Sequence, residues 1–336
     1  MNGDAARGLA WGMLGVLIFA LTMPMTRLAV GDQGAPQLPP AFVTAGRAGL
    51  AGLLSLAYLW ATRRGRLVPP PRPLWPLLAV SAAGTVVGFP LGLAMALREV
   101  PAMHASVVTG IIPLGTAVVA ALVLRQRASV GFWLCAAAGC ALVVVFAFLA
   151  GGGRLVAADA WLALAVVSTA FGYVAGARAS ALLSPPQTIC WVLVLSLPLT
   201  LPAMWLSWPH GAAGAPAAAD IGWPAWAGFG YVTLFSMWLG FFAWYRGLAL
   251  GGVLRVSQVQ LAQPFLALLA AVPILGEQLQ PLTVGFALAV VAVVFISRRM
   301  PVGAPGGPAA VAEVAAVRAM SPTPSDSIDP TQGARA

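Results

Sequence analysis

Long apolar runs alternate with short polar, proline-rich or glycine-rich gaps along most of the chain. A helix rises 1.5 Å per residue, so about 20 apolar residues suffice to cross the hydrocarbon core of a membrane. The runs are about twice as long as the strands of a membrane barrel, and they lack period-two alternation. The pattern predicts an all-α integral membrane protein with ten transmembrane helices. We expect these near residues 8–30, 41–61, 74–97, 102–124, 129–149, 159–181, 188–208, 223–250, 252–275 and 282–297.

The predicted helices divide into two similar halves, residues 8–149 and 159–299. A shift of 151 residues places segment 106–113 on segment 257–264 without a gap through the helix, and each segment has a polar pair before a proline. Each half holds five helices, an odd number, so the second half must cross the membrane in the opposite direction. The pattern predicts two inverted five-helix repeats. Chance self-alignment of low-complexity apolar sequence is the alternative.

Composition and charge agree with a membrane location. Hydrophobic residues make up 60% of the chain and charged residues only 8%, and the net charge of +9 comes from 18 basic residues, all arginine. These arginines lie one to three at a time between apolar runs, whereas a nucleic-acid surface clusters its basic residues. We therefore expect membrane lipid and a small-molecule substrate as partners, and no nucleic acid. The sequence leaves monomer and homodimer both open.

The arginines also predict the orientation. Most fall in gaps on the N-terminal side of the predicted membrane, and only Arg98 and Arg154 fall in gaps on the other side. By the positive-inside rule, both termini should be cytoplasmic in a multi-pass protein of the cell's inner (plasma) membrane. Residues 300–336 are rich in Ala, Pro, Gly and Ser and contain no aromatic residue. They are expected to form a disordered cytoplasmic tail.

A segment of the predicted ninth helix carries a family resemblance. Residues 257–265 read Ser-Gln-Val-Gln-Leu-Ala-Gln-Pro-Phe, and residues 275–277 read Leu-Gly-Glu. This proline followed by a terminal Leu-Gly-Glu resembles the ninth-helix pattern of the EamA-type branch of the drug/metabolite transporter superfamily. The first copy keeps Pro113 but has Arg-Gln at 125–126, so an acidic role is not carried over to it. The resemblance covers roughly residues 8–299 and implies a secondary transporter, usually a metabolite exporter, with cytoplasmic termini.

Polar side chains inside the predicted helices are candidates for substrate contact. An unpaired polar group in hydrocarbon costs several kcal/mol, so each needs a partner or a water-filled cavity. Spacings of three and four place Ser257, Gln260 and Pro264 on one helix face, with Gln263 beside them. Pro264 also frees a backbone carbonyl one turn earlier. We expect a substrate site here, with hydrogen bonding that only joins helices as the alternative. The matching positions of the first repeat are Ser106, Thr109 and Pro113.

An aromatic stripe follows the predicted eighth helix. Its members are spaced four, three, four and three, which places them on one side of a regular helix. If this side lines the cavity, it gives an apolar substrate a broad contact area. Packing against lipid or other helices is the alternative. Trp238, nearest the middle of the membrane, and Phe242 are expected to contact the substrate. The stripe consists of Tyr231, Phe235, Trp238, Phe242 and Tyr245.

Three ionisable residues are candidates for a gating or charge role. Arg47 lies about six residues inside the second predicted helix, and intramembrane arginine is costly unless it is functional or reaches the headgroups. Glu277, on the same predicted side, could pair with Arg47 or Arg27. His104 could titrate near neutral pH or serve a structural role. No Asp or Glu lies in the middle of a predicted helix, so proton coupling and facilitated diffusion both stay open.

Other chemistry is poorly supported by the residues present. Cys135, Cys140 and Cys190 lie in apolar runs without His, Asp or Glu at ligand spacing, so we expect neither metal nor cofactor. A membrane enzyme acting on a lipid-linked substrate would need an acid, base or metal that two His cannot supply. The sequence therefore predicts a non-enzymatic exporter of an amino-acid-like or amphipathic metabolite by alternating access. Multidrug efflux is the main alternative.

Overall fold

The protein is all-helical in the part of the chain that the structure describes. This structure is a computed structural model, and it describes residues 3–62, 65–123, 129–180, 182–211, 216–251, 257–297 and 299–300. Eight of its helices are long and apolar enough to cross a membrane, and two shorter apolar helices, Gln263–Leu275 and Pro281–Ser297, follow them. The predicted all-α integral membrane fold is confirmed. Residues 252–256 of the predicted ninth helix and residues 301–336 of the predicted tail lie outside the described residues.

Where both ends are described, the helices at the predicted crossings begin and end within a few residues of the predicted bounds, but several crossings consist of more than one element. The first repeat contains α1 (Gly3–Ala20), α2 (Thr22–Val30), α3 (Pro40–Thr62), η1 (Arg72–Leu74), α4 (Trp75–Ser81), η2 (Ala82–Gly88), α5 (Phe89–Ala96), α6 (Ala102–Thr109), α7 (Ile112–Val123) and α8 (Val130–Ala150). The second contains α9 (Ala157–Ser180), α10 (Pro185–Leu206), α11 (Trp223–Tyr231), η3 (Val232–Leu239), α12 (Gly240–Gly251), η4 (Ser257–Ala262), α14 (Gln263–Leu275) and α15 (Pro281–Ser297).

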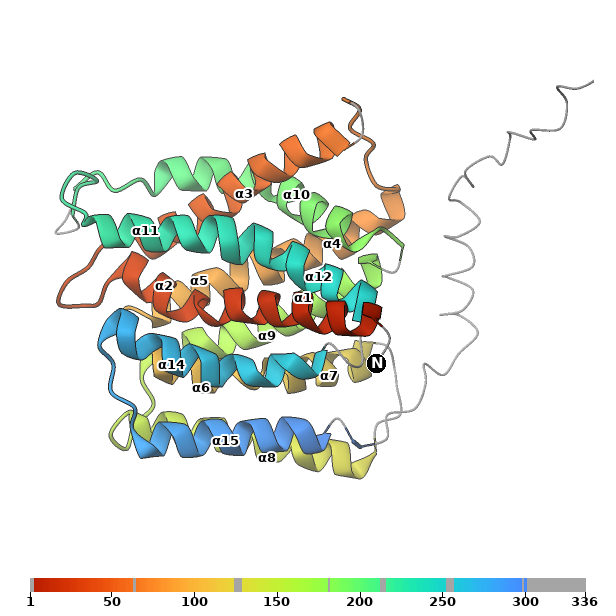
Figure 1. The fold of residues 1–336 in the computed structure, drawn as a ribbon. Helices are drawn as coiled ribbons and strands as arrows, with labels where there is room; N and C mark the ends of the chain where they lie inside the picture. Colours follow the sequence, from red (N-terminus) through yellow and green to blue (C-terminus); the bar gives the residue numbers. More distant parts are fainter. Residues whose placement is uncertain are drawn as a thin grey trace, which may run out of the picture.

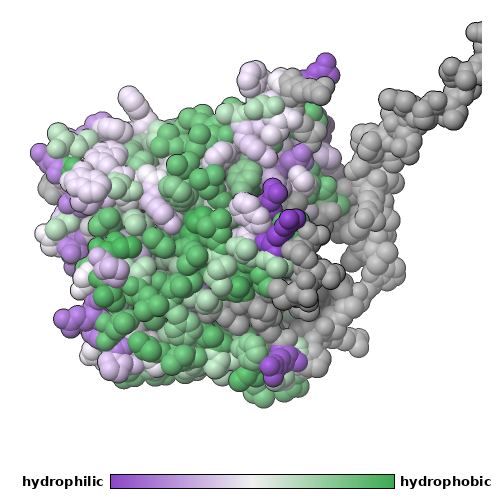
Figure 2. All heavy atoms as spheres, in the orientation of Figure 1, coloured by the Kyte–Doolittle hydropathy of each residue, from purple (hydrophilic) through white to green (hydrophobic). Residues whose placement is uncertain are grey.

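Successive crossings run in alternating directions, so the bundle has two sides. Gly3 and Ser297 lie at the same one, which we call the termini side (Figure 1). The other, which we call the opposite side, carries the connections 31–39, 97–101, 151–156 and 276–280. Because five crossings precede α9, the second repeat starts from the opposite side and is inverted relative to the first. On the face shown in Figure 2, apolar residues cover the middle of the bundle, and hydrophilic residues gather toward its two ends.

Helix pairing in the bundle follows a pseudo-two-fold pattern. The third crossing, formed by α4, η2 and α5, packs on α9, the first crossing of the second repeat. The equivalent pair with the repeats exchanged is α12, part of the third crossing of the second repeat, with α1, part of the first crossing of the first repeat. The remaining pairs join equivalent or complementary crossings of the two repeats: α3 with α10, α6 with α14, and α8 with α15. Exchanging the two repeats converts this set of pairs into itself, as inverted repeats require.

Glycines bring the backbones close together at both of the equivalent interfaces. A Cβ added to Gly84 of η2 would overlap the carbonyl oxygen of Ser168 and lie 2.8 Å from the Cα of Gly172 on α9. A Cβ added to Gly247 of α12 would lie 2.6 Å from the backbone nitrogen of Gly12 on α1. Small residues are the usual means of close helix packing in membranes, where apolar burial between helices gives little driving force.

The Gly84 interface provides a stability prediction. Gly84→Ala should lower the free energy of unfolding by about 1–3 kcal/mol, because the added methyl group must push two backbones apart. Gly230→Ala on α11 is the matched control, since a Cβ there would meet no atom within 4 Å. Thermal unfolding of both purified variants in detergent checks this. Equal melting temperatures for the two would show that the interface can absorb the methyl group.

Two π-helical segments interrupt equivalent crossings, the third and the eighth. They are η2 and η3, which begin at Ala82 and Val232. The π-helix has a wider turn than the α-helix and commonly marks functional positions. The apolar runs that predicted these crossings contain no sign of it, since both runs are continuous.

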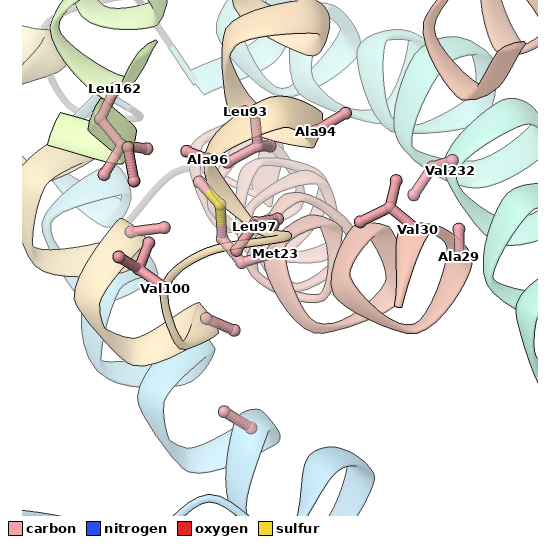
Figure 3. Packing of buried hydrophobic residues seen from close by; sticks show 14 of the residues in the cluster. Met23, Ala29, Val30, Leu93, Ala94, Ala96, Leu97, Val100, Leu162 and Val232 are labelled. Carbon is pink, nitrogen blue, oxygen red and sulfur yellow. The ribbon is translucent and has the colours of Figure 1, made fainter. Parts of the chain in front are cut away.

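The apolar core is concentrated toward the opposite side. We call the buried residues there the apolar plug; they include Phe42, Leu93, Leu97, Val100, Met103, Phe229, Val232, Leu268 and Ala271. They come from the parts of α3, α5, α6, α11, η3 and α14 nearer the opposite side and from the connection 97–101, and Figure 3 draws part of the set among the converging helices. The plug therefore packs apolar side chains of both repeats together on that side of the bundle.

Candidate functional site

A cavity of about 250 Å³ lies between the two repeats, on the termini side of the apolar plug. The helices that line it continue into the plug: Phe89 lines the cavity and Leu93 belongs to the plug, and Ala267 and Ala271 are related in the same way. Three phenylalanines, Phe19, Phe89 and Phe241, contribute apolar wall. The polar lining residues are Thr22, Arg47, Thr85, Ser106, Thr109, Thr116, Thr169, Tyr173, Ser236, Gln260 and Gln263.

Most of the residues predicted for the site meet at this cavity, although they are far apart in sequence. Ser257 belongs to η4, but its side chain lies outside the described part of the structure. Trp238 and Phe242 are not among the lining residues. The predicted residues that do line the cavity are Arg47, Ser106, Thr109, Pro113, Gln260, Gln263 and Pro264.

The helix breaks at the two prolines face each other across the cavity. Helix α6 ends at Thr109 and α7 begins at Ile112, while η4 gives way to α14 one residue before Pro264. A Cβ added to Gly110 would lie 3.5 Å from Cγ of Pro264, so the two breaks lie close together. Proline has no N–H to offer the carbonyl four residues earlier. Pro113 and Pro264 therefore cannot donate the α-helical hydrogen bond to the carbonyls of Thr109 and Gln260.

The lining amides and hydroxyls differ in what they leave free. Ser106 donates to the Ala102 carbonyl at 2.8 Å and Thr109 to the Ala105 carbonyl at 2.7 Å. These hydroxyls are held by their own helix but keep oxygen lone pairs for another donor. The side chains of Gln260 and Gln263 bond to no other described group. Each amide can both donate to and accept from a ligand.

A polar chain missed by the sequence analysis crosses the wall of the cavity. Arg47 of α3 donates from Nη2 to Oγ of Ser236 at 3.0 Å, and this oxygen lies 2.8 Å from Oγ1 of Thr22. Thr22 shows the signal used for the ninth helix, a polar residue shortly before a proline, here Pro24. Ser236 does not precede a proline in this way. It lies between Phe235 and Trp238 of the aromatic stripe, where the sequence pattern drew attention to the aromatic residues.

The aromatic stripe does not face the cavity as one surface. Trp238 and Phe242 pack on Tyr58 of α3, with ring centroids 6.4 Å and 5.0 Å apart. Tyr231 stacks on Phe235 at 5.2 Å. The regular spacing assumed an α-helix, whereas η3 has a wider turn through these positions. Phe241, one position from the stripe, lines the cavity instead.

This placement changes what substitution of Trp238 should do. Trp238→Ala is expected to lower the free energy of unfolding by about 1–3 kcal/mol, because its ring packs between helices, and to leave substrate preference unchanged. Trp223→Ala is the matched control, since Trp223 is 78% exposed. Detergent melting curves and substrate competition on both variants check the prediction. A changed order of substrates in Trp238→Ala would return this ring to the binding site.

Glu277 and His104 hold the start of α6 on the opposite side. Glu277 accepts hydrogen bonds from the backbone N–H groups of Ala102 at 2.6 Å and Met103 at 2.9 Å. A carboxylate is well placed at a helix N-terminus, where the free N–H groups and the helix dipole favour it. Nε2 of His104 lies 2.8 Å from Oδ1 of Asp159 at the start of α9. Both contacts join the first repeat to the second.

Among the described residues, Glu277 therefore bonds to backbone N–H groups and not to Arg27 or Arg47, a pairing that the sequence left open. Arg27 instead donates to the carbonyls of Leu97 and Val100 and lies 3.6 Å from Asp32. Free N–H groups at the start of α6 compete better for Glu277 than a guanidinium that already has backbone and carboxylate partners. The described residues contain no group of three or more His, Cys, Asp or Glu that could hold a metal ion.

Comparison with known proteins agrees with this architecture. The sequence profile described as the EamA-like transporter family matches residues 6–149 and again residues 156–298. A Bacillus subtilis (strain 168) protein described as the uncharacterized transporter YdeK is 43% identical over 288 residues, covering 86% of this chain and 96% of the relative. A protein of Streptantibioticus cattleyicolor described as a probable terminal-alkyne amino-acid exporter is 30% identical over 303 residues, covering 86% of this chain and 93% of that protein.

A solved structure shares the fold. It is described only as the crystal structure of a protein, and it matches with a TM-score of 0.57 at 21% identity over 87% of this chain and 98% of the other. The names of the family and of the two relatives describe transporters, not enzymes. The resemblance carried by the ninth-helix pattern is confirmed. This chain belongs to the EamA-like transporter family.

Proposed function

We propose that the protein exports a small amphipathic metabolite of amino-acid type by alternating access. The observation that carries the proposal is the cavity, which both repeats line at their proline breaks and which the apolar plug closes on one side. Its volume of about 250 Å³ is below the roughly 300–1,000 Å³ usual for drug-sized ligands, which favours a small metabolite over multidrug efflux. Two inverted repeats offer two nearly equivalent packings around one central site.

The lining supports an amphipathic substrate. Phe19, Phe89 and Phe241 suit an apolar side chain, whereas the amides of Gln260 and Gln263 suit polar groups. One relative, at 30% identity, is named as a probable exporter of an amino acid. These observations together favour a compound with one short apolar part and hydrogen-bonding groups.

The position of the plug supports the proposed direction of transport, which is export. The arginine distribution predicts that the termini side faces the cytoplasm. With the plug closing the opposite side, the cavity would then load from the cytoplasm, as an exporter requires. Opening of the plug and closure of the termini side would release the substrate outside the cell.

Reconstituted protein tests the function directly. Proteoliposomes loaded with unlabelled norvaline or leucine should accumulate the same labelled amino acid by counterflow, and protein-free liposomes should not. Repeating the assay with and without a pH gradient separates proton coupling from facilitated diffusion. Exchange of the dye ethidium without exchange of any amino acid would favour multidrug efflux and contradict the proposal.

A labelling experiment tests the orientation. Leu67→Cys and Gln278→Cys place single thiols at exposed positions on the termini side and the opposite side, after Cys135, Cys140 and Cys190 are changed to Ala. A membrane-impermeant maleimide added to intact cells should label Gln278→Cys and spare Leu67→Cys, which reacts only after the cells are opened. The reverse pattern would invert the topology and, with it, the proposed direction of loading.

A further inference from the structure

We propose that Arg47 is the anion-binding residue of the cavity and that the substrate carries a carboxylate that pairs with it; this rests on the proposed transport function. Arg47 lines the cavity but is only 3% exposed, so its guanidinium does not reach a headgroup region. Nη2 donates to Ser236, and Nε and Nη1 have no hydrogen-bond partner. A buried guanidinium with two unsatisfied nitrogens is an incomplete site.

The protein provides no counter-ion for this charge among the residues that the structure describes. None of the described residues that line the cavity is acidic. Arginine stays protonated in proteins, so it cannot escape the cost of burial by losing its proton. An anion from outside the chain would supply the missing charge. The acidic side chains that the structure describes, Asp32, Glu99, Asp159, Asp220 and Glu277, lie in the connections or at helix ends on the opposite side.

Two simpler roles for Arg47 explain less. Snorkelling to the interface would leave the guanidinium exposed, which it is not. If Arg47 served only to join helices by hydrogen bonds, its guanidinium would use more of its donors. It makes a single hydrogen bond, to Ser236, among the described residues. The contact with Ser236, itself bonded to Thr22, instead fixes one edge of the guanidinium, and Nε and Nη1 stay buried without a partner.

The chemistry of the cavity favours a carboxylate over a phosphate. A carboxylate carries one charge and matches the guanidinium fork with two parallel hydrogen bonds. Arg47 is the one cationic side chain among the described lining residues, which is too little positive charge for a phosphate dianion. The same imbalance disfavours a ligand whose only charge is an amine, because no lining carboxylate would neutralise it.

Three related probes separate these possibilities. Norvaline carries both charged groups, pentanoate lacks the amine, and butylamine lacks the carboxylate. For the purified full-length protein, norvaline and pentanoate should raise the melting temperature, whereas butylamine and inorganic phosphate should not. Arg47→Met should weaken norvaline and pentanoate binding about tenfold to a hundredfold, the usual loss for a hydrogen bond to a charged group. Arg246→Met removes an exposed arginine that lies outside the cavity and should bind all probes as the parent does.

A milder pair of variants covers the case in which Arg47→Met does not fold. Ser236→Ala frees the edge of the guanidinium and should weaken pentanoate binding less than Arg47→Met, while Arg47→Lys keeps the charge but loses the fork and should weaken it too. The proposal would be overturned if butylamine bound as tightly as pentanoate, or if the protein preferred phosphate to both carboxylates. It would also be overturned if neither carboxylate bound, or if every Arg47 and Ser236 variant kept the parent's affinity for pentanoate.

Counterflow measured on the same preparations distinguishes failure of the carboxylate site at Arg47 from failure of the proposed transport function. Norvaline exchange that survives in Arg47→Met with unchanged affinity would reject the carboxylate site and leave the transport function standing. Conversely, pentanoate binding that depends on Arg47, in a protein that exchanges no amino acid, would support the anion site and reject the proposed function.

Discussion

Crosslinking position 104 to position 159 should abolish transport, and reduction of the crosslink should restore it. In the structure, His104 of α6 and Asp159 of α9 approach to 2.8 Å across the two repeats on the opposite side. Alternating access requires this side to open, so a covalent link between the repeats should hold the protein with its cavity closed to that side. The expected loss is nearly complete, because every transport cycle needs the opening.

The experiment uses His104→Cys with Asp159→Cys in a background without the natural cysteines. A short bifunctional methanethiosulfonate reagent joins the thiols, and norvaline counterflow is measured before linking, after linking and after reduction. Each single variant, treated identically, shows how much loss comes from removing the His–Asp contact or from modifying one thiol. Undiminished transport by the fully crosslinked protein would mean that these helices do not separate during the cycle.

The opposite side has features of a closure that can open. Few of the described side-chain hydrogen bonds on this side join the two repeats: Glu277 accepts from the N-terminus of α6, His104 contacts Asp159, and Gln37 accepts from the backbone N–H of Gly222. Beneath them the plug buries apolar side chains from both repeats, Met103 of α6 facing the same cluster as Leu268 of α14. Opening would replace protein contacts by water at each of these groups. A substrate that stabilises the open packing would have to supply the difference in free energy.

Much of the fold could be predicted, because the bilayer restricts it strongly. Apolar runs of sufficient length must cross as helices, and their number in each half decides the relative orientation of the repeats. The same symmetry explains why Thr109 and Gln260 meet at one cavity. Equivalent positions of inverted repeats lie at similar depth on either side of the pseudo-two-fold axis, so residues near it come together.

Side-chain contacts that depend on local helix geometry or on the packing of distant helices could not be predicted from the sequence. Spacing along an ideal helix predicted a single aromatic face, but η3 changes the turn, and Trp238 packs on Tyr58 instead. Arg47 could be recognised as unusual from its depth in an apolar run, whereas its partners Ser236 and Thr22 depend on how three distant helices pack. Glu277 was placed on the correct side, but its partners are backbone N–H groups, which no side-chain pattern reveals.

Replacing the amides of the ninth crossing should weaken substrate binding while largely preserving stability. Gln260→Leu and Gln263→Leu keep approximate side-chain volume and remove every amide donor and acceptor. Each should cost about 1–3 kcal/mol of binding free energy for norvaline, if its amide bonds the ligand. Neither side chain bonds to another described group, so the folded protein loses little when the amide is removed. Gln278→Leu, at an exposed position in the connection between α14 and α15, is the matched control.

Substrate-dependent stabilisation and counterflow of the three glutamine variants separate binding from packing. The expected pattern is a norvaline affinity about tenfold to a hundredfold weaker in Gln260→Leu and Gln263→Leu, with the control unchanged. Amides that only joined helices would give another pattern, because interhelical hydrogen bonds average about 0.6 kcal/mol and their loss appears in stability. A lower melting temperature with unchanged norvaline affinity in both variants would therefore assign these amides to the architecture and move the binding site away from the proline breaks.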